Sequence, residues 1–109
     1  MVKLFTFRNM ETYIHESSNI YDSAEIGEGT RIGAFVEIGH KVKIGKNCMI
    51  AGQVGFAGSS TLGNNVMIGG QAGISGHLKI GNNVQIAGGS GVIKNIPDNS
   101  RVMGYPAKD

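Results

Sequence analysis

The sequence predicts an all-β fold, in which one chain winds into a single-stranded parallel β-helix of hexapeptide repeats. A large aliphatic or aromatic residue recurs every six positions from Ile14 to Val92, fourteen times without a slip of register. A small or apolar residue follows each of them four positions later, and glycine or alanine comes directly after ten of the fourteen. An α-helix does not fit this period, because six residues drift around its turns and make no continuous apolar stripe.

Each repeat supplies one short strand and one corner. Three repeats make a triangular coil, so residues 18 apart in the sequence stack along the axis, at the spacing of hydrogen-bonded strands. The fourteen repeats make between four and five coils. We expect the large residues to point inward, with Ile26, Ile44, Leu62 and Ile80 in one ladder. Glycine and asparagine are expected to take the backbone angles of the corners.

The repeat divides the chain into three segments. Residues 1–13 are rich in apolar side chains and are expected to cap the open end of the β-helix, since an exposed end coil invites edge pairing. Residues 14–96 form the hexapeptide-repeat β-helix itself. Residues 97–109 form a C-terminal tail that carries Pro97 and Pro106 and is expected to leave the repeat.

The composition fits one small domain. The chain has 109 residues, of which 40% are hydrophobic and 17% are charged. Its one cysteine, Cys48, excludes an intrachain disulfide and falls at an inward position, so we expect it in the core and not as a nucleophile. No signal peptide and no apolar run of membrane length is visible in the sequence. These features predict a cytoplasmic protein without stable membrane insertion.

Charge is unevenly distributed. Six of the eight acidic residues lie in the first 37 positions, and none lies between Ile38 and Pro97. That acid-free stretch holds five lysines, namely Lys41, Lys43, Lys46, Lys79 and Lys94. A region with one sign of charge attracts anionic ligands, although ordinary solvated lysines would give the same pattern. Nucleic acid is not expected as a partner, because the chain has no arginine cluster and few aromatic residues to stack on bases.

Three histidines are the candidate general bases, because imidazole changes its charge near neutral pH. His40 and His77 are separated in the sequence by two coils plus one residue, which places both on one edge of the prism. Their separation along the axis is about 10 Å on the strand spacing. His15 lies in the acidic part of the chain and is expected to be structural. No cluster of His, Cys, Asp or Glu with ligand spacing is present, so no metal site is expected.

From Ile38 onward the sequence contains the runs IGHKVKIGKNCMIAGQVGFAGSSTLGNNVMIGGQAGISGHLKIGNNVQIAGGSGV and IPDNSRVMGYPAKD. These runs, about two thirds of the chain, resemble the UDP-3-O-acylglucosamine N-acyltransferases of lipid A biosynthesis. The most specific parts are IGH around His40, AGQVGFAGS, and SGHLKIG around His77. The resemblance implies a left-handed β-helix and a homotrimer, neither of which follows from the period alone.

The resemblance also implies catalytic roles. His40 matches the general base that deprotonates the 2-amine of a glucosamine as the amine attacks an acyl thioester. Gly58, one coil further along, matches the glycine whose backbone N–H stabilises the oxyanion, a role that needs a donor close to the developing charge. Substrate contacts are expected from His77 and Gln53. The donor phosphate is expected to contact Lys79, Lys94 and Arg101.

The co-substrate that the resemblance implies is the thioester of an acyl carrier protein or of CoA, with no tightly bound cofactor. The acceptor would be an amino sugar, in the family a UDP-linked one. The family's uridine-binding domain and C-terminal helical extension have no counterpart in these residues, and the first 37 positions resemble a generic sugar acetyltransferase. Two alternatives therefore stay open. One is an acetyl-CoA-dependent sugar O- or N-acetyltransferase, and the other is an inactive trimeric scaffold or truncated fragment.

Overall fold

The computed structural model describes the backbone of residues 2–7 and 10–109 and the side chains of residues 12–109. These residues form short strands joined by turns, and they include no helix that could span a membrane. The strands are β1 (Val2–Phe7), β2 (Met10–His15), β3 (Asn19–Ile20), β4 (Glu25–Ile26), β5 (Arg31–Ile32), β6 (Glu37–Ile38), β7 (Lys43–Ile44), β8 (Met49–Ile50), β9 (Gly55–Phe56), β10 (Thr61–Leu62), β11 (Met67–Ile68), β12 (Gly73–Ile74), β13 (Lys79–Ile80), β14 (Gln85–Ile86), β15 (Gly91–Val92) and β16 (Arg101–Val102).

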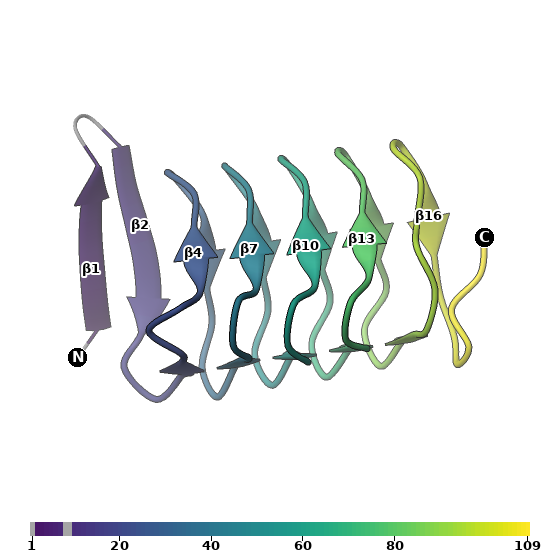
Figure 1. Cartoon of the computed structure of the whole chain (residues 1–109), viewed down its shortest axis with the longest axis horizontal. Coiled ribbons are helices and arrows are strands. Elements are labelled where there is room, and N and C mark those ends of the chain that lie inside the picture. Colours follow the sequence, from purple (N-terminus) through teal and green to yellow (C-terminus); the bar gives the residue numbers. More distant parts are fainter. Residues whose placement is uncertain (1, 8–9) are drawn as a thin grey trace.

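The strands stack into the three faces of a triangular prism (Figure 1). The seven-strand face has the order β1-β2-β5-β8-β11-β14-β16, the five-strand face β15-β12-β9-β6-β3, and the four-strand face β13-β10-β7-β4. Neighbouring strands are parallel in all three faces except in the β1–β2 hairpin. The predicted parallel β-helix is therefore confirmed, with about five turns. The left hand that the resemblance implies stays a prediction.

The core consists of the large residues that recur every six positions. Ile26, Ile44, Leu62 and Ile80 pair in register on successive coils, as predicted. Each short strand points one side chain out and the next one in, because successive side chains of a strand alternate, and from β5 onward the inner one is buried. The regular length of the coil therefore turns a sequence period into three continuous apolar ladders.

Three edges join the faces, and we name them by their side chains. The histidine edge, between the five-strand and four-strand faces, consists of residues 22–23, 40–41, 58–59, 76–77 and 94–95. The asparagine edge, between the four-strand and seven-strand faces, consists of residues 28–29, 46–47, 64–65, 82–83 and 98–99. The glutamine edge, between the seven-strand and five-strand faces, consists of residues 16–17, 34–35, 52–53, 70–71 and 88–89.

Glycine and asparagine take the corner angles only in part as expected, at Gly29 and Gly89 and at four asparagines. The left-handed backbone angle falls three residues after each large residue from Ile26 to Ile86, where Lys41 (φ 60°), Gln53 (φ 63°) and His77 (φ 60°) adopt it as well as asparagine. The glycine directly after the large residue serves a different purpose. A Cβ on Gly39 would lie 2.8 Å from the Phe56 carbonyl oxygen of the next coil. Close stacking of the coils, and not a positive φ, therefore explains the repeated glycine.

The N-terminal segment continues the seven-strand face as a hairpin. β2 pairs with β5, and β1 adds one antiparallel strand beyond it (Figure 1). Ile14 is fully buried at this end, whereas Ile20 and Ile26 are only partly buried. The side chains of Val2, Leu4, Phe5 and Phe7, from which a cap was expected, lie outside the described residues.

The C-terminal tail stays against the prism beyond the regular repeat. Ile96 forms a bridge to Ile80, and β16 pairs with β14 so that Val102 stacks on Ile86. This last step is shorter than a regular coil, because position 102 and not position 104 follows position 86 in the ladder. Beyond β16 the chain turns back, and Ala107 is 7% exposed at the end of the core. Residues 97–109 therefore depart from the six-residue period, while β16 still adds a last rung to the seven-strand face.

Candidate functional site

His40 and His77 lie on the histidine edge, as the spacing predicted. The N–H of Ser59 donates to the His40 carbonyl at 2.8 Å, and the N–H of His77 donates to the Gly58 carbonyl at 3.1 Å. These bonds stack three successive turns of the chain. Both imidazoles are exposed, so this edge presents two histidines to the solvent.

Gly58 lies directly over His40 on the next coil. A Cβ on Gly58 would lie 3.3 Å from the Cδ2 atom of the His40 ring and 3.2 Å from the His40 carbonyl oxygen. The imidazole therefore packs against the bare Cα of Gly58. Within residues 12–109 the Gly58 N–H donates to no acceptor, whereas the N–H groups of Ala57 and Ser59 on either side are both engaged. A ring that can accept a proton and an unengaged N–H donor thus lie on adjacent coils.

The His40 ring has a second neighbour that the sequence did not reveal. Tyr21, on the coil before it, lies edge-to-face with the imidazole, with 6.0 Å between ring centroids and 78° between planes. No hydrogen bond to either ring nitrogen of His40 occurs among the described residues. Tyr21 occupies the position one coil and one residue before His40. That spacing places the two residues beside the same edge on successive coils, although it does not give the orientation of their rings.

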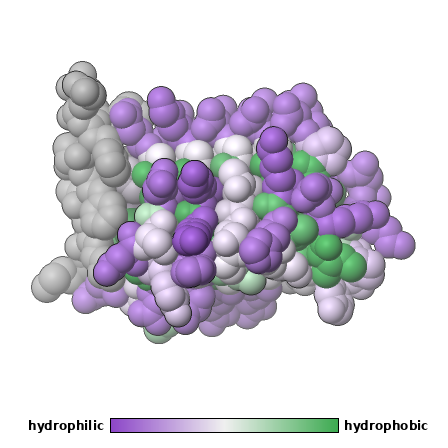
Figure 2. All heavy atoms as spheres, viewed as in Figure 1, coloured by the Kyte–Doolittle hydropathy of each residue, from purple (hydrophilic) through white to green (hydrophobic). Residues whose placement is uncertain are grey.

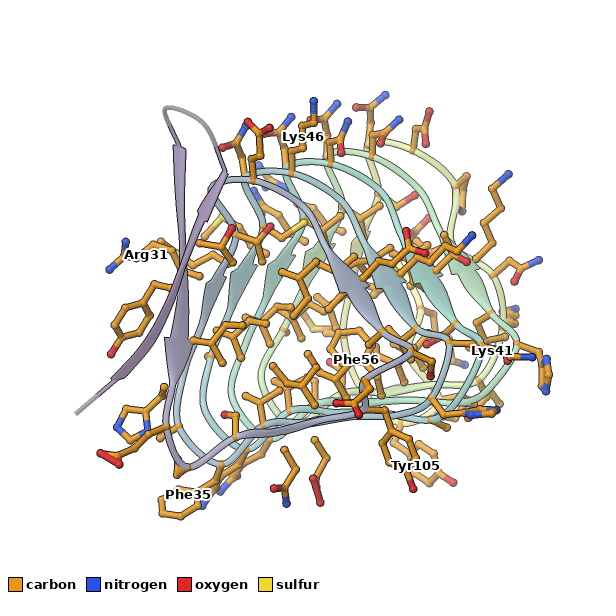
Figure 3. The ribbon with its side chains drawn as sticks, turned by 60° about the vertical axis from the view of Figure 1, so that its left-hand side comes forward. Arg31, Phe35, Lys41, Lys46, Phe56 and Tyr105 are labelled. Carbon is orange, nitrogen blue, oxygen red and sulfur yellow. The ribbon has the colours of Figure 1, made fainter. Side chains whose placement is uncertain are left out.

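The lysines gather around the four-strand face. Lys43 and Lys79 point outward from β7 and β13, Lys41 and Lys94 lie on the histidine edge, and Lys46 lies on the asparagine edge. Figure 2 shows hydrophilic side chains over this face, and Figure 3 shows Lys41 and Lys46 at two different edges. Within residues 12–109 no carboxylate pairs with any of them. Lys43 and Lys79 thus share the outer side of the four-strand face with Glu25, whose backbone pairs in register with that of Lys43.

Gln53 and Arg101 lie elsewhere on the subunit. Gln53 is on the glutamine edge, where its side-chain oxygen accepts a hydrogen bond from the amide of Gln71 at 2.7 Å. Arg101 projects from β16 on the seven-strand face. One chain alone therefore brings together His40, Gly58 and His77 with Lys79 and Lys94 nearby, and it separates Gln53 and Arg101 from them.

The two faces that meet at the glutamine edge differ in the size of their outward side chains. The seven-strand face carries Met49 and Met67, which are 51% and 50% exposed, and a largely apolar groove of about 580 Å³ runs past them to Arg101. The five-strand face carries glycine at its outward positions on β9, β12 and β15, and the Tyr105 ring covers Gly91 of β15, whereas β3 and β6 carry Asn19 and Glu37 there. A Cβ on Gly55 or Gly73 would meet no atom within 4 Å. Nothing within the described chain therefore requires these two glycines.

Cys48 belongs to the core, as expected. Its side chain is 1% exposed, and the thiol donates to the Gly63 carbonyl at 3.2 Å. Burial is the main cause that raises the pKa of the Cys48 thiol, so the reactive thiolate is disfavoured. Elsewhere in the described residues, no three His, Cys, Asp or Glu side chains lie close enough together to hold a metal ion.

Comparison with protein families identifies the repeat. The model described as bacterial transferase hexapeptide (six repeats) matches residues 23–58 and 59–94. The chain therefore belongs to the bacterial transferases with hexapeptide repeats. Comparison with curated proteins gives no significant match.

Several solved structures share the fold. Serine acetyltransferase from Brucella abortus is 28% identical with a TM-score of 0.82, over 86% of this chain and 42% of that one. UDP-N-acetylglucosamine O-acyltransferase from Moraxella catarrhalis is 30% identical with a TM-score of 0.75, over 78% and 33%. PerB from Caulobacter crescentus, solved with CoA and GDP-perosamine, is 23% identical with a TM-score of 0.65, over 89% and 56%. The chain thus spans between about a third and just over half of these structures.

Proposed function

We propose that the chain is the catalytic β-helix of an acyltransferase, which moves an acyl group from a thioester to the amine of a sugar. The observation that carries the proposal is the stacking of the His40 imidazole on Gly58, whose N–H has no acceptor in the described chain. Acyl transfer needs both groups, because a base must remove a proton from the nucleophile and a donor must stabilise the oxyanion.

The chemistry balances with these two groups alone. The amine nitrogen attacks the thioester carbonyl and forms the C–N bond, while His40 takes a proton from the nitrogen. The tetrahedral oxyanion accepts a hydrogen bond from the Gly58 N–H. The C–S bond then breaks, and His40 returns its proton to the departing thiolate. His77, one further coil along the same edge, contacts the substrate beside the donor.

The finer assignment is to the UDP-3-O-acylglucosamine N-acyltransferases. It is supported by the IGH, AGQVGFAGS and SGHLKIG runs, since these carry His40, Gly58 and His77 to one edge. The lysines on the four-strand face and the histidine edge support an acidic acyl carrier protein as donor, because complementary charge speeds and orients such encounters. Lys79 and Lys94 would then contact the donor phosphate. We place the reaction in the cytoplasm, where such donors are found.

A homotrimer is proposed as the working assembly. Glycine within a strand often marks close approach by another backbone or a ligand. Gly55 and Gly73 leave open space on the five-strand face, which is complementary to the exposed methionines of the seven-strand face. The lysines of the four-strand face would repel their own copies. We therefore propose that the glutamine edge faces a three-fold axis, with the seven-strand face of one subunit opposite the five-strand face of the next.

This arrangement also explains why the expected site residues are divided. Around a three-fold axis each subunit occupies one third of the circle, whereas the edge of a triangular prism fills a smaller angle. The facing surfaces of neighbouring subunits therefore diverge away from the axis and leave a cleft that opens outward. The histidine edge of one subunit borders that cleft, and Arg101 of the partner subunit lies on the opposite wall. The apolar groove beside Met67 would line the same wall and accommodate an acyl chain.

Gly73→Arg should separate the trimer into folded monomers. The Cβ of the new side chain would meet no atom of its own subunit within 4 Å, and the side chain would occupy the surface on which the next subunit packs. Size-exclusion chromatography with light scattering should give three times the chain mass for the wild type and one chain mass for the variant. Thr61→Arg on the four-strand face is the matched control and should stay trimeric. A wild-type monomer at micromolar concentration rules out the trimer, and a trimeric Gly73→Arg variant rules out this choice of faces.

The activity is tested by release of free thiol from three donors in the presence of amino-sugar acceptors with and without UDP. We expect acceptor-dependent release from long-chain acyl carrier protein, with little from long-chain acyl-CoA or acetyl-CoA. Release from acetyl-CoA alone would favour the sugar acetyltransferase, which the likeness to serine acetyltransferase supports as the second candidate. If no donor releases thiol, the acyltransferase proposal is contradicted, and the inactive trimeric scaffold or truncated fragment is the remaining alternative.

A further inference from the structure

We infer that Tyr21 is a positioning residue that holds the His40 imidazole in place for proton transfer; this rests on the proposed function of His40. A histidine that acts as a base is ordinarily oriented by a hydrogen bond at its second ring nitrogen. No such bond to His40 occurs within residues 12–109. Some other contact must therefore fix the plane of the ring.

The imidazole is held between two coils. On one side its Cδ2 edge packs against the Cα of Gly58. On the other side the Tyr21 ring meets it edge-to-face at 6.0 Å and 78°, a geometry that aromatic pairs prefer because the positive edge of one ring meets the negative face of the other. Rotation of the imidazole about its side-chain bonds would break one contact or the other.

The backbone of Tyr21 is held by two hydrogen bonds. Its N–H donates to the Ile38 carbonyl at 3.1 Å, and its carbonyl accepts from the Ala24 N–H at 3.0 Å. The side chain is 61% exposed, so it contributes little to the core. The packing of the prism does not need this ring, and the contact with His40 is the role that we infer for it. The phenol hydroxyl forms no hydrogen bond among the described residues, so the ring alone carries the role.

The consequence is that both ring nitrogens of His40 stay open while the ring stays in one orientation. One nitrogen can then accept the proton of the acceptor amine without first breaking a hydrogen bond to the protein. Tyr21 lies outside the runs that resemble the N-acyltransferases, which begin at Ile38.

The test compares Tyr21→Leu with Tyr21→Phe, which keeps the ring and removes only the hydroxyl. In NMR spectra of protein with labelled histidine, Tyr21→Leu should move the His40 ring-proton signals, and Tyr21→Phe should leave them in place. The signals are assigned with His40→Ala. Unchanged His40 signals in Tyr21→Leu would overturn the contact, whatever the activity of the protein.

Kinetics separate positioning from a general loss of structure. Tyr21→Leu should lower kcat about tenfold with little change in KM, and Tyr21→Phe should match the wild type. In a His40→Ala background Tyr21→Leu should have no further effect, because residues that act through one group are not additive. Multiplied effects in the double variant, or equal losses in Tyr21→Leu and Tyr21→Phe, would overturn the inference. If His40→Ala itself is fully active, the proposed function fails, and the NMR comparison still decides the contact.

Discussion

We expect Ile68→Asp to leave the chain unfolded. Ile68 is 2% exposed, and it pairs in register with Ile50 and Ile86 in the inner ladder of the seven-strand face. A carboxylate at this position would have neither water nor a partner, and burying it costs several kcal/mol. The total stability of a small domain is only about 5–15 kcal/mol, so one such substitution removes most of it.

The control is Thr61→Asp, which places the same side chain on the exposed side of β10. It should keep the far-ultraviolet circular dichroism and the melting temperature of the wild type. Ile68→Val should also stay folded, since losing one buried methyl group costs about 0.5–1.5 kcal/mol. A soluble Ile68→Asp variant with a cooperative melting transition would contradict an inward-facing Ile68 and with it the register of the β-helix.

The sequence predicts the coil well because burial of the inward side chains imposes a strict six-residue period. Only inward positions must be large and apolar, and they recur at every sixth residue, so Ile26 through Ile80 could be placed in a ladder. The tail could not be placed, because Val102 stacks on Ile86 after a step that is shorter than a regular coil. After the repeat ends, the sequence has no period from which the pairing of later residues could be predicted.

The candidate site was predictable only in part. The spacing of two coils plus one residue placed His40 and His77 on one edge, which the backbone hydrogen bonds confirm. Gln53 is not separated from His40 by a whole number of coils, so its place on another edge could also have been foreseen. The contact with Tyr21 could not be predicted from spacing alone, because it depends on how two exposed side chains are oriented.

The glycines show a further limit of the sequence. Gly39 directly follows an inward residue and Gly73 directly precedes one. A Cβ on Gly39 would strike the next coil, whereas a Cβ on Gly73 would meet open space. One glycine is required by the stacking of coils, and the other has no such reason within the described chain. The sequence distinguishes the two positions but does not show that Gly73 is unconstrained by its own subunit, and glycines of this second kind mark the face on which we propose that a partner subunit packs.

His40→Ala should abolish most of the activity without affecting the fold. The side chain is exposed at a turn, so its removal leaves the core and the proposed subunit contacts intact. General base catalysis contributes about 10²–10⁴-fold to such reactions, and the rate should fall accordingly. His77→Ala is the comparison, because loss of a substrate contact should raise KM more than it lowers kcat.

The kcat of His40→Ala, measured by thiol release in the same oligomeric state as the wild type, tests the central claim most directly. The measurement uses every thioester donor that the wild type accepts, at saturating acceptor. A loss of about a hundredfold or more, with an unchanged melting temperature, is the result that a general base at this position predicts. An unchanged kcat with every accepted donor would contradict it and place the chemistry elsewhere on the protein.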